Sequence, residues 1–399
     1  MSSSGEFLSG GSRSARPGAS AAALSGVRWF DLGWHVLMVA MGLLGLGLFF
    51  LRAMAEGEDP PLDFENHLLK VCVTLPMLLV GLCLRPRFLR RHAYGIYGVC
   101  IALLVLLPVI GVERNNAKSW IELPLFDLQP SELAKLGLIL VLARALYKNR
   151  LRNFDQWSGP VILALLPMGL VAMQPDLGTA LTIVPITLGM LYLAGARASV
   201  LLRFIGATLV LAFCAVYFEV GVRDYQMQRI DTWLESVEPE ALIDGRNGPA
   251  FHAYHAHVAI GNGGVFGTGL GRGVANQTGY LPERTSDSIF AVVAEESGWF
   301  GATCILLLYG LLIALMFTSA AGIRDRFARL VVGGIGLYLA AHLFINVGVN
   351  VGLLPMTGLT LPLFSTGGSS LLVTFLALGI ALGLAAHHEP SLDGDAFRA

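Results

Sequence analysis

Ten long stretches of apolar residues, candidates for membrane-spanning helices, constrain this chain more than any other feature of its sequence. A helix that spans the hydrocarbon core needs about 17–25 residues, and its backbone groups are satisfied within the segment. The stretches lie near residues 34–51, 68–84, 93–111, 132–147, 159–173, 177–194, 199–220, 288–318, 330–353 and 368–387. They predict an all-α polytopic membrane protein with about ten transmembrane helices.

The composition argues against two or three water-soluble domains, which the length alone would suggest. Of the 399 residues, 55% are hydrophobic and only 14% are charged, too few charges to coat several solvent-facing surfaces. No basic patch interleaved with aromatic residues indicates nucleic acid. The five cysteines lie in apolar stretches without metal-ligand spacing, so we expect them to pack as small hydrophobic groups without disulfides.

Lysine and arginine predict the side of the membrane that each loop faces, because cytoplasmic loops carry an excess of them. They gather after the second, fourth and eighth stretches and around the sixth and seventh. Both termini are therefore expected in the cytoplasm, and the large loop at about 221–286, between spans 7 and 8, outside. Residues 1–30 are expected to be a disordered cytoplasmic tail, residues 31–388 the membrane domain, and residues 389–399 a second cytoplasmic tail.

A glycine-rich segment at residues 261–290 contains the sequence Pro-Glu-Arg-Thr-Ser-Asp, which ends at Asp287. A carboxylate at the mouth of a membrane helix is costly unless it is used or paired. In one interpretation Asp287 is a base for a lipid-tethered polar substrate, with Arg284 beside it. In the other, Ser286 or Asp287 is a helix N-cap. The residues alone leave both interpretations open.

A second candidate site, Gln-Pro-Ser-Glu-Leu-Ala-Lys at residues 129–135, opens the fourth stretch. Glu132 and Lys135, at positions i and i+3, share one helix face. They are either a self-neutralising pair that reaches back to the interface or part of a polar cavity, since a lysine inside a membrane is expensive.

Other polar groups have two interpretations each. Residues 355–370, rich in Gly, Thr and Ser, either bind a sugar or phosphate or cap the last helix. Glu295 and Glu296, inside the eighth stretch, contact either substrate or packing partners. No nearby carboxylate completes a metal-ligand set with His252, His255 and His257, so we expect no metal site there.

As an ordered set, these motifs resemble the SEDS family (shape, elongation, division and sporulation), the polytopic glycan polymerases of the bacterial cell wall. The matching segments are residues 116–121, 129–135, 174–180, 225–229, 259–271, 281–290 with Glu295 and Glu296, and 350–370. They cover nearly the whole chain from about residue 30, and the loop at 85–88 looks more RodA-like (elongation) than FtsW-like (division). The chain departs from the family pattern at Asn116, His252, His255, Ser286, Ser288 and Thr366.

The resemblance implies an inverting peptidoglycan glycosyltransferase in the bacterial cytoplasmic (inner) membrane. It would polymerise lipid II, release undecaprenyl pyrophosphate, and work beside a class B penicillin-binding protein that acts as transpeptidase. The family's catalytic aspartate maps onto Asp287, and its loop tryptophan onto Trp120. The residues expected to bind substrate are Lys135, Glu132, Trp120, Gln129, Arg229, Arg272, Arg284 and Ser369. No organic cofactor is expected; a divalent cation, Mg²⁺ or Mn²⁺, is compatible with this chemistry.

The chemistry suits these residues. An attacking sugar hydroxyl needs a positioned base, whereas pyrophosphate leaves readily and needs cations instead of an acid. One carboxylate together with lysine and arginine supplies both requirements. The alternatives are a flippase for lipid-linked precursors and an inactive scaffold for a penicillin-binding protein. Transporters commonly show inverted repeats and paired broken spans, which this sequence lacks, and the presence of Asp287, Glu132 and Lys135 argues against a scaffold.

Overall fold

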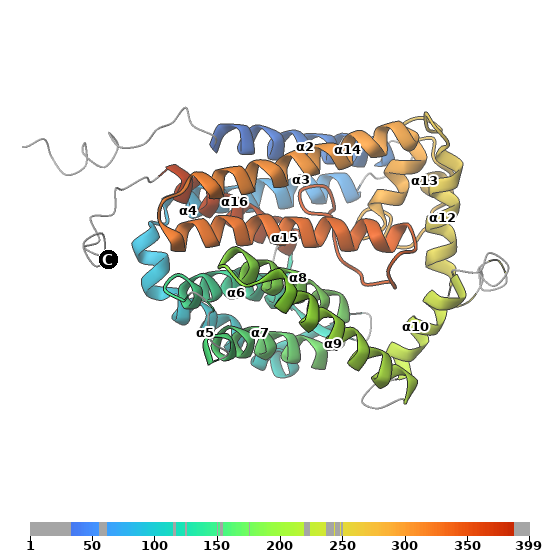
Figure 1. Ribbon diagram of the computed structural model, residues 1–399. Coiled ribbons are helices and arrows are strands. Elements are labelled where there is room, and N and C mark those ends of the chain that lie inside the picture. The colour runs from blue at the N-terminus through green and yellow to red at the C-terminus, as the bar shows by residue number, and fades with distance from the viewer. Residues whose placement is uncertain are drawn as a thin grey trace, which may run out of the picture.

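The computed structural model describes residues 33–55, 62–114, 117–123, 126–149, 151, 155–174, 176–218, 224–236, 243, 248 and 250–386. Most of these residues form long helices that run side by side (Figure 1). The expected tails at 1–30 and 389–399, Asn116, and parts of the expected outer loop lie outside the described residues. The predicted ten-span domain is therefore described only between residues 33 and 386.

Each of the ten predicted stretches overlaps a helix. These helices are α2 (Gly33–Ala55), α3 (Leu62–Thr74) with α4 (Pro76–Cys83), α5 (Pro86–Ile110), α6 (Pro130–Leu146), α7 (Asp155–Met173), α8 (Leu177–Leu193), α9 (Ala198–Tyr217), α14 (Ile289–Gly322), α15 (Arg326–Asn350) and α16 (Gly368–Ala386). Among the described residues, seven helical segments are long and apolar enough to cross a membrane. The prediction of a mostly helical membrane fold is confirmed.

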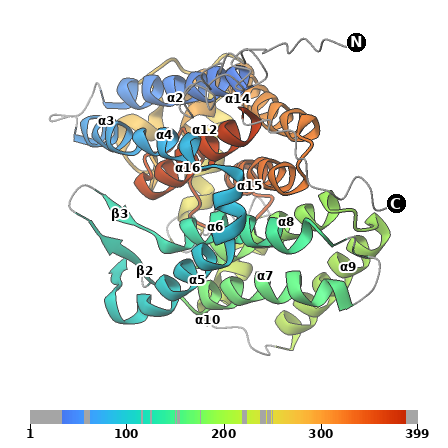
Figure 2. The ribbon, with the colours of Figure 1, turned by 90° about the vertical axis from the view of Figure 1, so that its left-hand side faces the viewer.

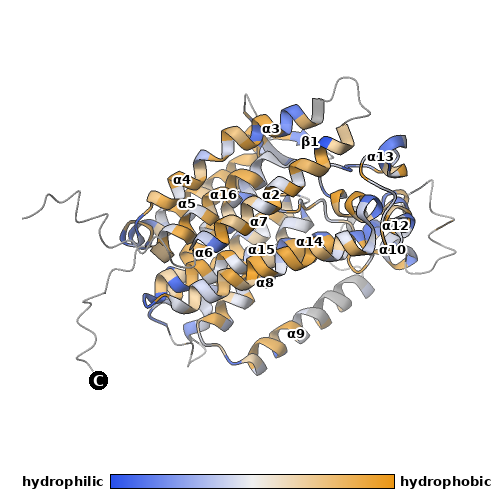
Figure 3. Cartoon of the chain, turned by 90° about the horizontal axis from the view of Figure 1, so that it is seen from above, coloured by the Kyte–Doolittle hydropathy of each residue, from blue (hydrophilic) through white to orange (hydrophobic). Residues whose placement is uncertain are grey.

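The helices α6, α15 and α16 form the buried centre of this bundle, and 14 of the 17 residues of α6 are buried. In the most apolar windows of α15 and α16, 72% and 78% of the residues are buried, against 22–39% in the other five candidate spans. Those five turn large apolar side chains outward, among them Leu79, Val99 and Leu307, and Figure 3 shows hydrophobic residues along the outer helices. A helix that is apolar all round belongs in a core or in lipid, and the two groups divide in this way.

Small residues let α4 cross α16 at close range. A Cβ atom at Gly81 would lie 2.5 Å from Leu376 O, and one at Gly383 would lie 2.7 Å from Leu82 O. Glycine at such crossings allows the two backbones to approach, which is how membrane helices gain packing energy.

A short antiparallel sheet, which was not predicted from the sequence, joins α5 to α6. Its strands are β1 (Val112–Arg114), β2 (Ala117–Glu122) and β3 (Asp127–Leu128), in the order β1-β2-β3 (Figure 2). Strands of two to six residues carry too little alternation to be recognised in a sequence. The sheet corrects the all-α prediction locally, and β3 leads directly into the start of α6.

The helix α14 is broken at Gly298, where φ is +67°. The glycine segment after α12 (Phe251–Gly263) lies against this break with its backbone. Thr268 N donates to Glu295 O at 3.0 Å, Gly269 N to Glu296 O at 3.1 Å, and Trp299 N to Gly264 O at 2.9 Å. The groups that the broken helix leaves unpaired are satisfied in this way, which a buried backbone requires. Part of the glycine segment therefore supplies the backbone hydrogen bonds that α14 loses at its break.

The arginine-rich turns lie together at one end of the bundle. Arg326 Nη2 donates to Asn149 O and Ala194 O at 2.8 and 2.7 Å, and Arg90 Nη1 lies 4.0 Å from Asp325 Oδ1. The opposite end carries α10 (Asp224–Ser236), α12 and α13 (Val274–Thr278), as Figure 1 shows. The two ends of the bundle therefore differ in architecture, and Arg90 and Arg326 lie at the end away from α10, α12 and α13.

Candidate active site

The start of α6 carries Glu132 and Lys135 into the centre of the bundle. Pro130 lies in the first helical turn, where its missing amide hydrogen breaks no helical bond. Lys135 Nζ donates to Glu132 Oε1 at 2.7 Å, and the two side chains are 0% and 3% exposed. The predicted sharing of one helix face is confirmed. The lysine does not reach back to the interface, however, so that interpretation is wrong.

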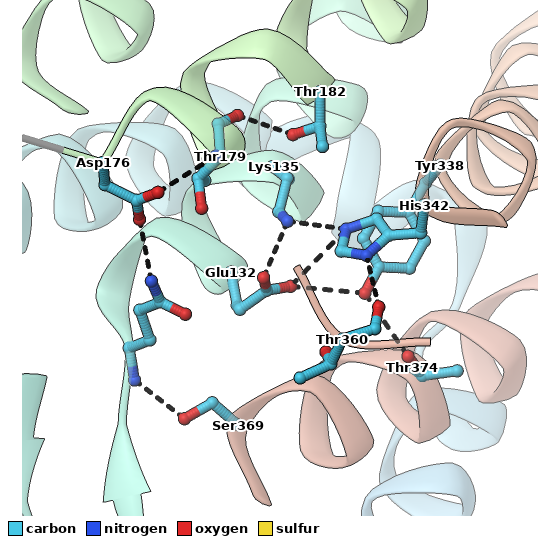
Figure 4. A network of polar contacts seen from close by, with 11 residues as sticks. Glu132, Lys135, Asp176, Thr179, Thr182, Tyr338, His342, Thr360, Ser369 and Thr374 are labelled. Carbon is cyan, nitrogen blue, oxygen red and sulfur yellow. Dashed lines mark hydrogen bonds and ion pairs between the residues drawn. The ribbon is translucent and has the colours of Figure 1, made fainter. Parts of the chain in front are cut away.

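Two residues of α15 complete this buried network. Lys135 Nζ lies 2.7 Å from His342 Nε2, and the Tyr338 hydroxyl donates to Glu132 Oε2 at 3.3 Å. Thr374 Oγ1 of α16 lies 3.3 Å from the same hydroxyl. Figure 4 shows these side chains converging from α6, α15 and α16. An ion pair away from water costs several kcal/mol per ion unless such hydrogen bonds compensate it, so the pair and its neighbours form one unit.

Gln129 and Ser369, both expected to bind substrate, connect this network to neighbouring elements. Gln129 Nε2 donates to Asp176 Oδ2 at 2.8 Å, and Asp176 Oδ1 accepts from Thr179 N at 3.0 Å at the start of α8. Gln129 N donates to Ser369 Oγ at 2.8 Å, and Ser369 Oγ donates to Asp127 O at 2.5 Å. These contacts fix the entry of α6 relative to α8 and α16.

Asp287 lies two residues before α14, and α15 fixes its backbone. Asn346 Nδ2 and Asn350 Nδ2 both donate to Asp287 O at 2.9 Å. The N-cap residue of α14 is Ser288, which makes no side-chain capping hydrogen bond. Asp287 Oδ1 is buried and has no hydrogen-bond partner among the described residues. Helix capping therefore does not account for this carboxylate.

The surroundings of Asp287 adjust its acidity. Burial raises the pKa of Asp287 to about 7, the negative charge of Glu283 adds to the rise, and the backbone amides of Asp287 and Ser288 oppose it. A general base is most effective when its pKa lies near the working pH. Strong perturbation of a half-buried carboxylate is also a common mark of a functional group.

The loop between α15 and α16 joins the segment of Asp287 to the buried network. Thr366 N donates to Thr285 O at 3.0 Å, and Ser365 Oγ donates to Ser286 O at 2.5 Å. A Cβ atom on Gly358 would lie 3.8 Å from Asp287 Oδ2. The hydroxyl groups of Ser365 and Thr366, predicted to bind substrate or cap a helix, are thus engaged with the segment that precedes α14.

A polar stripe on α15 supplies the partners that the sequence analysis missed. Tyr338, His342, Asn346 and Asn350 recur every fourth residue, so they share one helix face, and all are at most 2% exposed. At 1.5 Å per residue, His342 lies about 9 Å along the axis from the midpoint of Asn346 and Asn350. The signal in the sequence was this spacing of polar residues within an apolar stretch.

The basic and aromatic residues expected to bind substrate lie near the outer helices and the sheet. Arg229 Nη1 donates to Met356 O at 3.3 Å, and Arg284 Nη1 donates to Asn276 O at 2.7 Å. Arg272 is exposed just before α13, and Trp120 is half-buried in β2. Arg229 therefore contacts the loop after α15, whereas Arg284 turns toward α13.

Glu295 and Glu296 differ although they are neighbours. Glu295 Oε1 and Oε2 accept from Val274 N and Ala275 N at 3.0 Å, at the start of α13. The packing interpretation is therefore confirmed for Glu295. Glu296 is 2% exposed, and neither of its carboxylate oxygens has a hydrogen-bond partner among the described residues.

The three histidines of α12 have different partners. His252 Nε2 contacts Ser288 Oγ, and the His255 ring lies 4.3 Å from the Tyr280 ring. A Cβ atom at Gly352 would lie 2.5 Å from His257 Nε2. Burial lowers the pKa of His252 to about 4, with a contribution from His255, so His252 is neutral near pH 7.

Comparison with known proteins places the whole domain in one group. The cell cycle protein family of FtsW, RodA and SpoVE matches residues 30–390. The peptidoglycan glycosyltransferase MrdB of Escherichia coli (strain K12) is 34% identical over 89% of this chain and 93% of that protein. A probable peptidoglycan glycosyltransferase FtsW of Geobacter metallireducens is 38% identical over 90% and 96%.

Solved structures agree with this assignment. A chain from a peptidoglycan synthase complex that coordinates polymerization and crosslinking superimposes with a TM-score of 0.77 and 30% identity, covering 91% of this chain and 100% of that one. The rod shape determining protein RodA of Thermus thermophilus gives a TM-score of 0.67 and 29% identity over 90% and 99%. These similarities extend across both polar sites.

Proposed function

The chain belongs to the SEDS family of FtsW, RodA and SpoVE cell cycle proteins, and we propose that Asp287 is the general base of its glycosyl transfer. The protein is a peptidoglycan glycosyltransferase that polymerises glycan for the cell wall, which decides against a flippase or an inactive scaffold. The observation that carries the proposal is the half-buried Asp287 carboxylate, with an unpartnered Oδ1 and a pKa of about 7.

The reaction exchanges one bond to the anomeric carbon of the donor for another. The acceptor hydroxyl forms a new C–O bond at the anomeric carbon of lipid II, the bond to the diphosphate breaks, and the hydroxyl proton passes to Asp287. Displacement from the opposite face inverts an α-linked donor to a β-linked product. The diphosphate leaves as an anion, so it needs positive charge instead of an acid.

Lys135 supplies that charge from within the bundle, and Arg229, Arg272 and Arg284 supply it from the outer end. An ammonium group has three N–H donors, and two of those of Lys135 face Glu132 and His342. We assign the third to a diphosphate oxygen. Because the Lys135 side chain is wholly buried here, the diphosphate can contact it directly only if the substrate displaces some of the side chains that cover it.

The residues that the structure describes offer no ligand set for a resident divalent cation. Among the residues that the structure describes, no three His, Cys, Asp or Glu side chains form a ligand set. Mg²⁺ or Mn²⁺ would therefore enter bound to the diphosphate of lipid II, and no step above depends on it.

The arginine-rich turns at one end of the bundle support the assignment of that end to the cytoplasm, as ten spans with both termini inside require. Arg90 and Arg326 lie at the end where cytoplasmic loops are expected. Along α15, Asn346 follows Arg326 by 20 residues, which is about 30 Å and matches the hydrocarbon core. Asp287, whose backbone carbonyl accepts a hydrogen bond from Asn346, then lies at the outer side of the membrane, where the polymer grows.

The partner follows from the same assignment. We assign a class B penicillin-binding protein as the transpeptidase partner and lipid II and undecaprenyl-linked glycan as substrates, in a bacterial inner membrane. The structural neighbour from a complex that couples polymerization and crosslinking supports this pairing. The RodA-like interpretation of the 85–88 loop favours the elongation machinery.

The test compares two aspartate variants of the purified full-length protein with lipid II in detergent. Asp287→Asn is expected to lower polymerisation by about 10²–10⁴-fold, the contribution of a general base, while remaining folded in the membrane. Asp231→Asn, on the exposed surface of α10, is the matched control and should polymerise normally. Chain growth by Asp287→Asn at the wild-type rate would remove Asp287 from this role.

A further inference from the structure

His342 lies between Lys135 and the loop after α15. Its Nε2 lies 2.7 Å from Lys135 Nζ, and its Nδ1 lies 3.3 Å from Thr360 O. The side chain is 0% exposed, so water does not compete for either contact. Figure 4 shows the imidazole placed between these two groups.

The contacts fix which ring nitrogen carries the hydrogen. A lysine ammonium only donates hydrogen bonds, and a carbonyl oxygen only accepts them. His342 Nε2 must therefore be the acceptor from Lys135, and Nδ1 must carry the hydrogen that points to Thr360 O. The imidazole is therefore neutral, with the hydrogen on Nδ1. Its hydrogen bond to the loop fixes the orientation of the ring, and the ring in turn fixes the orientation of the Lys135 ammonium.

The same loop bears on the segment of Asp287. Asn346, one turn beyond His342 on α15, donates to Leu359 O at 2.7 Å and to Asp287 O at 2.9 Å. Successive carbonyl groups of the loop, at Leu359 and Thr360, are thus held by successive turns of one helix. The same helix, α15, and the same loop therefore fix both the position of Asp287 and the orientation of the Lys135 side chain.

We infer that His342 is a positioning residue for glycosyl transfer. His342 orients the ammonium of Lys135 toward the diphosphate and keeps that ammonium at a fixed position relative to Asp287. This inference rests on the proposed function, in which Lys135 and Asp287 act on one substrate. Misplacing a reacting group by about 1 Å costs about 10²-fold in rate, which sets the scale of the expected effect.

Three variants of the full-length protein separate orientation from general support. His342→Gln keeps an acceptor oxygen and an N–H donor group on its amide. His342→Leu keeps similar bulk and removes both, and His342→Met serves if the leucine variant does not fold. The matched control is Tyr309→Phe, because Tyr309 OH donates to Pro362 O at 2.7 Å from a buried site. It also ties a helix to this loop but makes no contact with Lys135.

Initial rates over a range of lipid II concentrations give kcat and KM, and thermal unfolding reports folding. We expect His342→Leu to lower kcat about 10–100-fold with KM changed less than about 3-fold, and His342→Gln and Tyr309→Phe to stay within about 3-fold of wild type. Wild-type kcat in His342→Leu or His342→Met overturns the inference, as does equal loss in the glutamine variant or in Tyr309→Phe. Asp287→Asn in the same assay reports separately on the proposed function.

Discussion

Replacing Glu283 by glutamine should let the enzyme work at lower pH. A base acts only when deprotonated, so the rate of polymerisation should rise with pH through the pKa of Asp287, which is about 7. After burial, the negative charge of Glu283 is the next cause of that raised pKa. Removing a neighbouring negative charge stabilises the carboxylate form, so the acidic limb of the profile should move toward lower pH.

The structure limits how far the limb moves. Glu283 is exposed, and interactions of exposed charges are worth about 0.2–1 kcal/mol. One pKa unit corresponds to about 1.4 kcal/mol, so the shift is about 0.15–0.7 unit. At about pH 6 the deprotonated fraction of Asp287 then rises about 1.4–4-fold, whereas at about pH 8.5 both enzymes are almost fully deprotonated. The gain should therefore be confined to acidic pH.

The assay is the initial rate of lipid II polymerisation between about pH 5 and 9 for wild type, Glu283→Gln and Glu235→Gln. Glu235 is also exposed on the outer end, on α10, and its variant should follow the wild-type profile. His252 contacts Ser288 beside Asp287, but its pKa of about 4 places its titration below this range. A limb that stays in place, or moves upward, in Glu283→Gln would refute the reasoning.

Three further outcomes test the packing around the site. Lys135→Met should destabilise the protein by about 3–5 kcal/mol because it leaves the buried Glu132 unpaired, and the double variant with Glu132→Gln should regain stability but not activity, as measured by thermal unfolding and polymerisation. Gly298→Ala should cost more than the about 1–3 kcal/mol of its φ of +67° alone, because an added Cβ would also collide with the backbone at Val265 and Gly267, whereas Gly310→Ala on the same helix has open space and should not. Asn346→Leu should lower both the unfolding temperature and kcat, since buried Leu359 O loses this donor, worth about 1–3 kcal/mol, while Asp287 O keeps only the donor from Asn350 of the two amides that hold it.

Local patterns made part of the site predictable. The pairing of Glu132 and Lys135 follows from their spacing within one helix. The helix that carries them follows from apolar length and a proline start. Both inferences depend only on residues close together in the sequence, and the structure confirms both.

Long-range partners were not predictable in the same way. His342 is 207 residues from Lys135 in the sequence, and hydropathy does not encode which helices become neighbours. The break in α14 was also hidden, because Gly298, between Ser297 and Trp299, looks in the sequence like any helical glycine, and only the structure shows Gly264 O accepting from Trp299 N. The spacing of Tyr338, His342, Asn346 and Asn350 was visible, but its meaning depended on knowing that α15 is buried.

The single helix α15 sets the relative depth of the two polar sites. Asn346 and Asn350 hold the backbone of Asp287 at one level, and His342 and Tyr338 hold Lys135 and Glu132 one to three turns deeper. All four contacts come from one face of α15, whereas Lys135 and Glu132 belong to α6, which Gln129 also ties to α8 and α16. A movement of α15 relative to α6 would therefore disturb the contacts of both polar sites together. A bulky substitution at Gly334, packed against Ile139 and Met190, would provoke such a movement.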